Sequence, residues 1–302
     1  MHEETVYDAL ANAHDDAHHW AFGTGFDDPL AGVDTTVPDG VDPADLGAYC
    51  LMLGDDALVL AQRLTEWITA SPELEEEVAL ANLALDLLGQ ARLLLARAGT
   101  AGALGRSRSL ATESIPDEDA LAYFRDADEF RHTPLVEAPN GDFAQTIARL
   151  LVAATVRLAM FARLRESRDP VLAAIAGKGV AELAYARDHA ARWLVRLGDG
   201  TEESHRRAQA GVAAVWPLTA ELFTATDVEE RLAAAGVAVD PAALREEVTA
   251  VLTDVLRQAT LELPARPADV PPRGRLGEHG SELAALLDRL QGLAREHPAA
   301  TW

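Results

Sequence analysis

Two reactive residue types are almost missing from this sequence of 302 residues, which has one cysteine, Cys50, and one lysine, Lys178. A single cysteine excludes an internal disulfide and is typical of proteins from a reducing cytoplasm. Aromatic residues are also scarce, at 5%, although hydrophobic residues reach 49% and are mostly Ala and Leu. This usage favours packed helices over sheets.

Positively charged residues are also scarce relative to negatively charged ones. The chain has 26 Lys and Arg against 49 Asp and Glu, so its net charge is −23, and 25 of the 26 basic residues are arginine. An acidic protein of this kind does not have nucleic acid or an anionic membrane as its main partner. No uninterrupted apolar run reaches the roughly 18 residues that span a bilayer, and the acidic N-terminus predicts no targeting peptide. We therefore expect a cytoplasmic protein, whose acidic, lysine-poor surface reflects either a high-salt cytoplasm or a GC-rich genome.

Helical periodicity and capping signals predict an all-α fold. We interpret residues 1–42 as an N-terminal extension and linker, and residues 43–302 as one helical domain that includes a C-terminal helix. The N-cap signals are Asp42-Pro43, Ser71-Pro72, Asp142 and Asp169-Pro170. The long predicted helices span 43–70, 73–97, 143–165, 170–197 and 201–223, the last one kinked at Pro217, and shorter ones span 117–132, 227–235, 240–261 and 281–296.

In the extension, His14 and His18 lie one helical turn apart, a workable spacing for metal ligands, but a solvated tail explains them better.

The helix at 73–97 sets the main question about function. Between Glu77 and Arg92 its only charged residue is Asp86, so we expect a core helix that is apolar around most of its circumference. Asn82, Asp86 and Gln90 recur every four residues and form one polar stripe. A buried carboxylate needs a metal ion, a cation or several hydrogen-bond donors.

Inward carboxylates in a bundle of four long helices suggest the ferritin-like di-iron scaffold. That site takes one Glu from each of two helices and a Glu-x-x-His pair from each of the other two. Here Asp86 is followed by Gly89, and Glu182 by Tyr185, where each histidine should stand. The 143–165 helix has no Asp, Glu, His or Cys, and the first helix offers only Asp55, Asp56 or Glu66. The scaffold fits, but the metal site is degenerate.

Several stretches carry a resemblance to a known family, over about residues 45–295. They are LGDDALVLAQRLTEW (53–67), PELEEEVALANLALDLLGQARLLL (72–95), FRDADEFRHTPLVEAPNGDFAQTIAR (124–149), RLGDGTEESHRRAQAGVAAVWPLTAELF (196–223) and GRLGEHGSELAALLDRLQ (274–291). Together they resemble the structural, non-catalytic subunits (PaaC) of the multicomponent phenylacetyl-CoA 1,2-epoxidase of aerobic phenylacetate degradation. One departure is Ala186, where the family is expected to have a polar residue.

The resemblance implies partners and cofactors. It implies that this chain supports a related catalytic subunit, which activates oxygen at a di-iron centre, and that it has neither a catalytic residue nor a metal of its own. A reductase subunit would supply electrons from NADPH, and a small bridging subunit would complete the assembly. Three alternatives stay open: a reduced but working metal site built from Asp86, Glu182, His189 and a carboxylate of the first helix; a helical scaffold of another complex; and a homo-oligomer when the chain is alone.

We predict that a core polar cluster replaced the metal site. Its candidate members are Asp55, Asp86, Lys178, Glu182, Tyr185 and His189, of which the last four share one helix face. Lys178 precedes Glu182 by one turn, so we expect its ammonium group to point inward and to bond Glu182, Asp86 or both.

Overall fold

A computed structural model describes residues 30, 32–105, 115–298 and 300 of the chain. The extension up to residue 29, with His14 and His18, lies outside the described residues. The described ranges contain helices and no strand, which confirms the predicted all-α fold. Among the described residues, short turns and the longer irregular segment 259–273 connect the helices.

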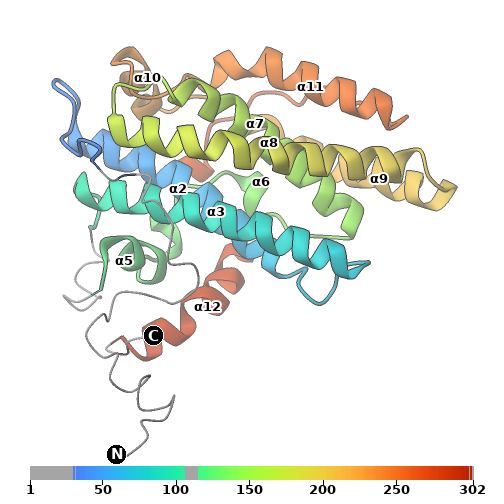
Figure 1. Ribbon diagram of the computed structural model, residues 1–302, viewed down its shortest axis with the longest axis horizontal. Coiled ribbons are helices and arrows are strands. Elements are labelled where there is room, and N and C mark those ends of the chain that lie inside the picture. The colour runs from blue at the N-terminus through green and yellow to red at the C-terminus, as the bar shows by residue number, and fades with distance from the viewer. Residues whose placement is uncertain (1–29, 31, 106–114, 299, 301–302) are drawn as a thin grey trace, which may run out of the picture.

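Four long helices form the body of the molecule: α2 (Pro43–Thr65), α3 (Leu74–Thr100), α7 (Phe143–Leu164) and α8 (Pro170–Gly198). Helix α2 packs along α3, and α7 packs along α8. The contact between α3 and α8, which run side by side in Figure 1, joins the two pairs into a four-helix bundle. One continuous apolar core fills the space between these helices.

The remaining helices cover the bundle from outside. They are α5 (Asp117–Tyr123), η1 (Ala127–Glu129), α6 (Pro134–Glu137), α9 (Glu202–Val215), η2 (Trp216–Glu221), α10 (Asp227–Ala234), η3 (Pro241–Leu244), α11 (Arg245–Gln258), η4 (Gly274–Leu276) and α12 (Ser281–Glu296). Helices α9 and α11 pack on α7 and α8, whereas α5 packs on α3 and carries α12 (Figure 1). The C-terminal part of the chain therefore lies at the opposite edge of the bundle from α11.

Three of the predicted helix starts are confirmed by their cap geometry. The side chains of Asp42, Asp142 and Asp169 each accept a hydrogen bond from a backbone N–H of the first helical turn, at 2.9, 3.0 and 2.8 Å. These bonds satisfy amide groups that have no partner inside the helix. The sequence signal of Asp or Asp-Pro was sufficient at all three positions.

Several other boundaries differ from the prediction: α2 ends at Thr65 and not near residue 70, and the helix expected over 117–132 is two elements, α5 and η1. Two further differences have a clear cause. Helix α3 begins at Leu74, and Ser71 does not cap it, because the Ser71 hydroxyl donates instead to the carbonyl of Trp67 at 3.0 Å. Pro217 does more than kink the fifth helix: α9 ends at Val215 and a 3-10 turn follows. A proline removes the amide that would continue the α-helical ladder, which accounts for this change.

Glycines allow the close approach of α2 and α3. Gly47 and Gly54 lie two turns apart on one face of α2. A Cβ atom at Gly47 would lie 2.9 Å from the Cβ of Ala103, and one at Gly54 would lie 3.0 Å from Leu95. The tight pairing of these two helices therefore depends on two missing side chains.

Helix α3 is less buried than the sequence predicts. Four of its large aliphatic residues are exposed: Leu74, Val78, Leu85 and Leu88. The expectation of a core helix, buried around most of its circumference, is wrong because one apolar stripe faces away from the bundle. By length and composition α3 could even cross a membrane, although it contains no unbroken apolar run of that length, and 44% of its apolar window is buried. One such helix is weak evidence for a membrane, because core helices of soluble proteins have the same properties.

Candidate functional site: the bundle centre and the α3–α8 face

The six residues of the predicted polar cluster do not lie together at the bundle centre. Asp55 is fully buried on α2, whereas Asp86 and Glu182 are only partly buried. Lys178 is about half exposed, with its Nζ 3.9 Å from Oε1 of Glu182, so the expectation that it points inward is wrong. The predicted ion pair with Glu182 exists, but as a long contact at the surface.

Tyr185 and His189 also lie away from the centre. The Tyr185 ring is exposed and stacks on His189, with centroids 6.2 Å apart. The Nε2 atom of His189 lies 3.1 Å from Oε2 of Glu76, a buried carboxylate on α3. His189 therefore joins α8 to α3 and does not converge with Asp86 and Glu182 on one point.

A buried arginine, Arg157 of α7, occupies the bundle centre instead. Its Nη1 donates to the backbone carbonyl of Leu53 on α2 at 3.1 Å, and its Nη2 donates to Oε1 of Gln90 on α3 at 3.0 Å. The Nε2 of Gln90 then donates to Oε2 of Glu182 on α8 at 3.0 Å. One chain of hydrogen bonds thus connects all four bundle helices.

The charge of Arg157 is held in an unusual environment. Burial lowers the pKa of its guanidinium group to about 10, so the group stays protonated at neutral pH. Its face lies 5.0 Å from the ring centroid of Phe161, and its Nε makes no hydrogen bond to the described residues. The two groups that accept its hydrogen bonds, a carbonyl and an amide, are neutral, so negative charge is supplied from a greater distance by Asp56.

The two carboxylates of α2 are bound by arginines from distant segments. Asp55 accepts two hydrogen bonds from Arg125, one of them at 3.0 Å, and a third from the backbone N–H of Arg131 at 2.8 Å. Asp56 accepts from Arg275 at 2.7 Å and from the N–H of Thr133 at 2.9 Å. Buried carboxylates compensated in this way are not free to bind a metal ion.

The line of contact between α3 and α8, which we call the seam, contains two partly buried carboxylates, those of Asp86 and Glu182. Burial raises the pKa of Asp86 and also that of Glu182, and the charge of Lys178 opposes each effect without cancelling it. We call this seam, together with the exposed aliphatic residues of α3 and the exposed ring of Tyr185 on α8, the α3–α8 face. Its members are Leu74, Val78, Leu85, Asp86, Leu88, Lys178, Glu182 and Tyr185.

Sequence reasoning did not identify the arginines as members of the site. The available signal lay in the 143–165 helix, which has no acidic residue but carries Arg149 and Arg157 within an apolar stretch. Both are buried, and Arg149 donates to the carbonyl of Ala138 and to the side chain of Asn140. A basic residue in the middle of an apolar helix predicts a buried cation as directly as a buried carboxylate predicts a counter-ion.

Within the described ranges, two groups of three side chains are close enough to share a metal ion. Neither group contains a residue of the predicted cluster. They are His132, Glu137 and His279, which are largely buried, and Asp126, Asp128 and Glu129, which lie at the surface.

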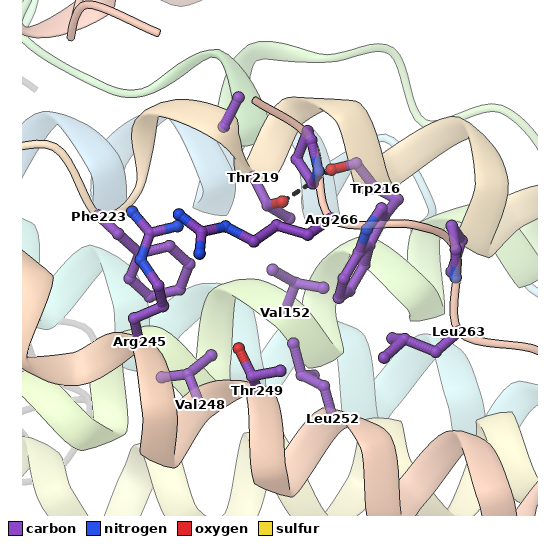
Figure 2. A pocket seen from close by; sticks show the side chains of 13 residues that line it. Val152, Trp216, Thr219, Phe223, Arg245, Val248, Thr249, Leu252, Leu263 and Arg266 are labelled. Atoms are coloured by element: carbon purple, nitrogen blue, oxygen red, sulfur yellow. Dashed lines mark hydrogen bonds between the residues drawn. The ribbon is translucent and has the colours of Figure 1, made fainter. Parts of the chain in front are cut away.

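A small cavity lies between α7, η2 and α11. Figure 2 shows it lined by Val152, Trp216, Phe223 and other apolar side chains, with Arg245 and Arg266 at one end. Both arginines bind the carboxylate of Asp269, each at 2.9 Å. The volume of the cavity is about 80 Å³, whereas an engineered cavity that binds benzene measures roughly 150 Å³. The cavity is therefore too small for an aromatic ligand unless its walls move.

The fold and the bundle centre define a class: an all-α, ferritin-like bundle whose central polar groups are joined by arginine. The sequence profile of the phenylacetic acid catabolic proteins (PaaA and PaaC) matches residues 34–302, and the chain belongs to this family. Over 257 residues the chain is also 44% identical to a component of the 1,2-phenylacetyl-CoA epoxidase of Escherichia coli (strain K12), the subunit designated C. That alignment covers 85% of this chain and 99% of the relative.

Proposed function

We propose that this chain is the structural, non-catalytic subunit of a multicomponent di-iron oxygenase that epoxidises the aromatic ring of phenylacetyl-CoA. The catalytic subunit would hold the di-iron centre, a reductase subunit would supply electrons from NADPH, and a small bridging subunit would join them. Support comes from the subunit name of the Escherichia coli relative and from the family match over most of the chain. The buried free thiol of Cys50 fits a cytoplasmic location.

The observation that carries the non-catalytic role is the position of Arg157. A di-iron site of this scaffold needs four carboxylates and two imidazoles from the four helices. Here one guanidinium group is hydrogen-bonded at the centre, and α7 contributes no carboxylate or imidazole. A fixed positive charge opposes the binding of two divalent cations at close range.

The α3–α8 face is the surface that we assign to the catalytic subunit. Four exposed aliphatic side chains on one helix form a stripe that is uncommon on proteins that act alone. The partly desolvated carboxylates of Asp86 and Glu182 have raised pKa values, because burial disfavours their charge. Hydrogen bonds or cations from a partner would relieve this cost.

The test is co-expression with the catalytic and reductase subunits, followed by an assay of phenylacetyl-CoA epoxidation with and without this chain. We expect no activity from this chain alone, activity that depends on its presence, and well under one iron atom per chain after aerobic reconstitution with ferrous iron. About two tightly held iron atoms per chain would contradict the non-catalytic role.

The interface has a separate test. Leu85→Asp and Leu88→Asp should each weaken assembly with the catalytic subunit by at least about tenfold, as expected for residues at the centre of an interface. The matched control is Leu293→Asp, because Leu293 is similarly exposed but lies on α12. If all three variants assemble like the wild type, the partner binds elsewhere.

A further inference from the structure

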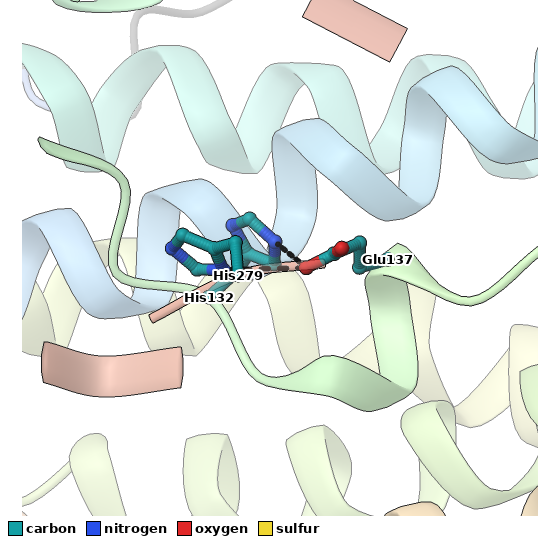
Figure 3. A group of neighbouring side chains, drawn as sticks. All are labelled: His132, Glu137 and His279. Carbon is teal, nitrogen blue, oxygen red and sulfur yellow. Dashed lines mark hydrogen bonds and ion pairs between the residues drawn. The ribbon is translucent and has the colours of Figure 1, made fainter. Parts of the chain in front are cut away.

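A second buried polar cluster lies between α2 and the C-terminal segment, outside the bundle centre. Figure 3 shows the rings of His132 and His279 stacked on each other, with one nitrogen of each directed at the carboxylate of Glu137. The ring centroids are 4.1 Å apart and the planes differ by 15°. Nε2 of His132 and Nδ1 of His279 both lie 3.2 Å from Oε2 of Glu137.

This geometry suits proton sharing better than metal binding. An imidazole nitrogen binds a metal along the lone pair in the plane of its ring, so two stacked rings direct their lone pairs past a common ion. In addition, a histidine ligand almost always donates its second N–H to a partner, whereas Nδ1 of His132 is buried and makes no hydrogen bond to the described residues. Hydrogen bonds to a carboxylate oxygen tolerate approach from outside the ring plane more readily.

The two rings differ in their hydrogen-bond partners. Both nitrogens of His279 face acceptors, the carbonyl of Phe130 at 2.9 Å and the carboxylate of Glu137, so His279 donates from both when it is protonated. His132 has one acceptor partner, Glu137, and therefore needs only one proton. Burial lowers the pKa of His132, which agrees with a neutral ring that needs only one proton.

Glu137 connects three parts of the chain through this cluster. Its Oε1 accepts from the backbone N–H of Gly280 at 2.9 Å, directly before α12 begins at Ser281. Its backbone carbonyl accepts from Nε and Nη2 of Arg63 on α2, at 3.0 and 2.7 Å. Burial alone would raise the pKa of Glu137, but hydrogen bonds from the two histidines hold it at about 2.

We propose that His132, Glu137 and His279 form a proton-sensitive latch that fixes the C-terminal segment, from His279 through α12, to the bundle. The latch is closed when the ring of His132 is neutral and Glu137 is ionised. A proton on His132 places a buried cation against the stacked ring of His279, and the attachment of α12 weakens.

The charges around His132 come from each element that packs against the latch. Helix α2 contributes Asp55, which favours protonation of His132, and Arg63, whose Nη2 lies 3.7 Å from Glu282 of α12. Asp55 is bound by Arg125, which lies 4.2 Å above the Phe130 ring that contacts His132 edge-on. The C-terminal segment itself contributes His279, whose charge opposes protonation of His132. No carboxylate other than Glu137 bonds either ring among the described residues.

The sign of the pH effect follows from the neutral state of His132. In the opened state the ring takes up a proton near its ordinary value of about 6.5, whereas in the closed latch it resists protonation. The closed state is therefore at full strength above about pH 6.5 and loses stability as the pH falls below it.

The experiment is hydrogen exchange of the α12 amides in the full-length chain at pH 7.5 and 5.5, corrected for intrinsic exchange. We expect the opening equilibrium of α12 to rise by up to about tenfold at pH 5.5, with a much smaller change in α7. In His132→Asn, whose side chain does not titrate, this pH dependence should disappear. His189→Gln is the matched control, because His189 also bonds a carboxylate but lies between α3 and α8.

An NMR titration of the histidine ring protons of the wild type keeps the proposal testable if His132→Asn does not fold. His132 should titrate below its ordinary value and together with the opening of α12. Titration of His132 at an ordinary value without any change in α12, or an unchanged pH dependence in a folded His132→Asn variant, would overturn the proposal. So would stoichiometric binding of zinc that this variant abolishes, since the cluster would then be a metal site. Failure of the epoxidase assay would leave these results unaffected.

Discussion

The guanidinium group of Arg157 donates to the side-chain oxygen of Gln90 across 3.0 Å, in the middle of a bundle where relatives of this architecture can hold metal ions. The side-chain NH₂ group of Gln90 in turn donates a hydrogen bond to Glu182. A glutamine is suited to this position because its side chain both accepts and donates, and so links a cation to a carboxylate.

Removal of Arg157 should be costly for stability. Arg157→Ala leaves a cavity and an unpaired Gln90 oxygen, so we expect a loss of about 3–5 kcal/mol in the free energy of unfolding. Arg157→Met fills most of the volume and should lose only about 1–3 kcal/mol, because the unpaired oxygen remains. Urea unfolding of the isolated chain measures both, and an Arg157→Ala variant as stable as the wild type would show that the interaction contributes nothing.

The buried ion pair between Asp55 and Arg125 should also be essential. Asp55→Ala leaves a buried guanidinium without its carboxylate and should destabilise the chain by about 3–5 kcal/mol. The exposed pair of Arg231 and Asp45 is the control, and Arg231→Ala should have a much smaller effect because solvent screens this pair. Equal effects of the two substitutions in thermal or urea unfolding would contradict the role assigned to burial.

Lys178 should be almost dispensable for stability of the isolated chain. Its side chain is about half exposed and its contact with Glu182 is 3.9 Å long, so Lys178→Ala should change the free energy of unfolding by less than about 1 kcal/mol. A loss of several kcal/mol would show that the ammonium group is desolvated in solution.

Glu182→Gln should stabilise the isolated chain at neutral pH. Burial raises the pKa of Glu182 in the folded state, so ionisation above the ordinary value costs stability as the pH rises. The neutral amide removes this cost and can still accept the hydrogen bond from Gln90. Unfolding measured from pH 4 to pH 7.5 should show an advantage of the variant that grows with pH, while an unchanged difference across this range would contradict the shift. In the assembled oxygenase complex, turnover should persist.

Most of the fold could be predicted because helix ends carry local signals. Asp42, Asp142 and Asp169 accept hydrogen bonds from backbone amides within three residues, so the adjacent sequence is enough to predict their role as N-caps. Ser71 has the same type of signal, but a competing carbonyl four residues earlier receives its hydroxyl. Local patterns predict such positions only when no neighbouring group competes.

The bundle centre could not be predicted in full because its partners are far apart in sequence. Arg125 and Arg275 are 70 and 219 residues from the carboxylates that they bind. The prediction that Lys178 is the central cation was also wrong. A positively charged side chain does lie at the centre, but it is that of Arg157. The exposure of Leu85 and Leu88 could not be predicted for a different reason, because a buried apolar stripe and an exposed one have the same sequence pattern.

The exposed stripe of α3 has a consequence for the association of free chains. In a free chain the aliphatic stripe is exposed and can associate with other copies. Electrostatic repulsion between molecules with a net charge of −23 opposes this association. Added salt shortens that repulsion to about 8 Å at physiological ionic strength and to about 3 Å at 1 M. At high ionic strength, free chains should therefore associate through this stripe, and a partner that covers the stripe would prevent it.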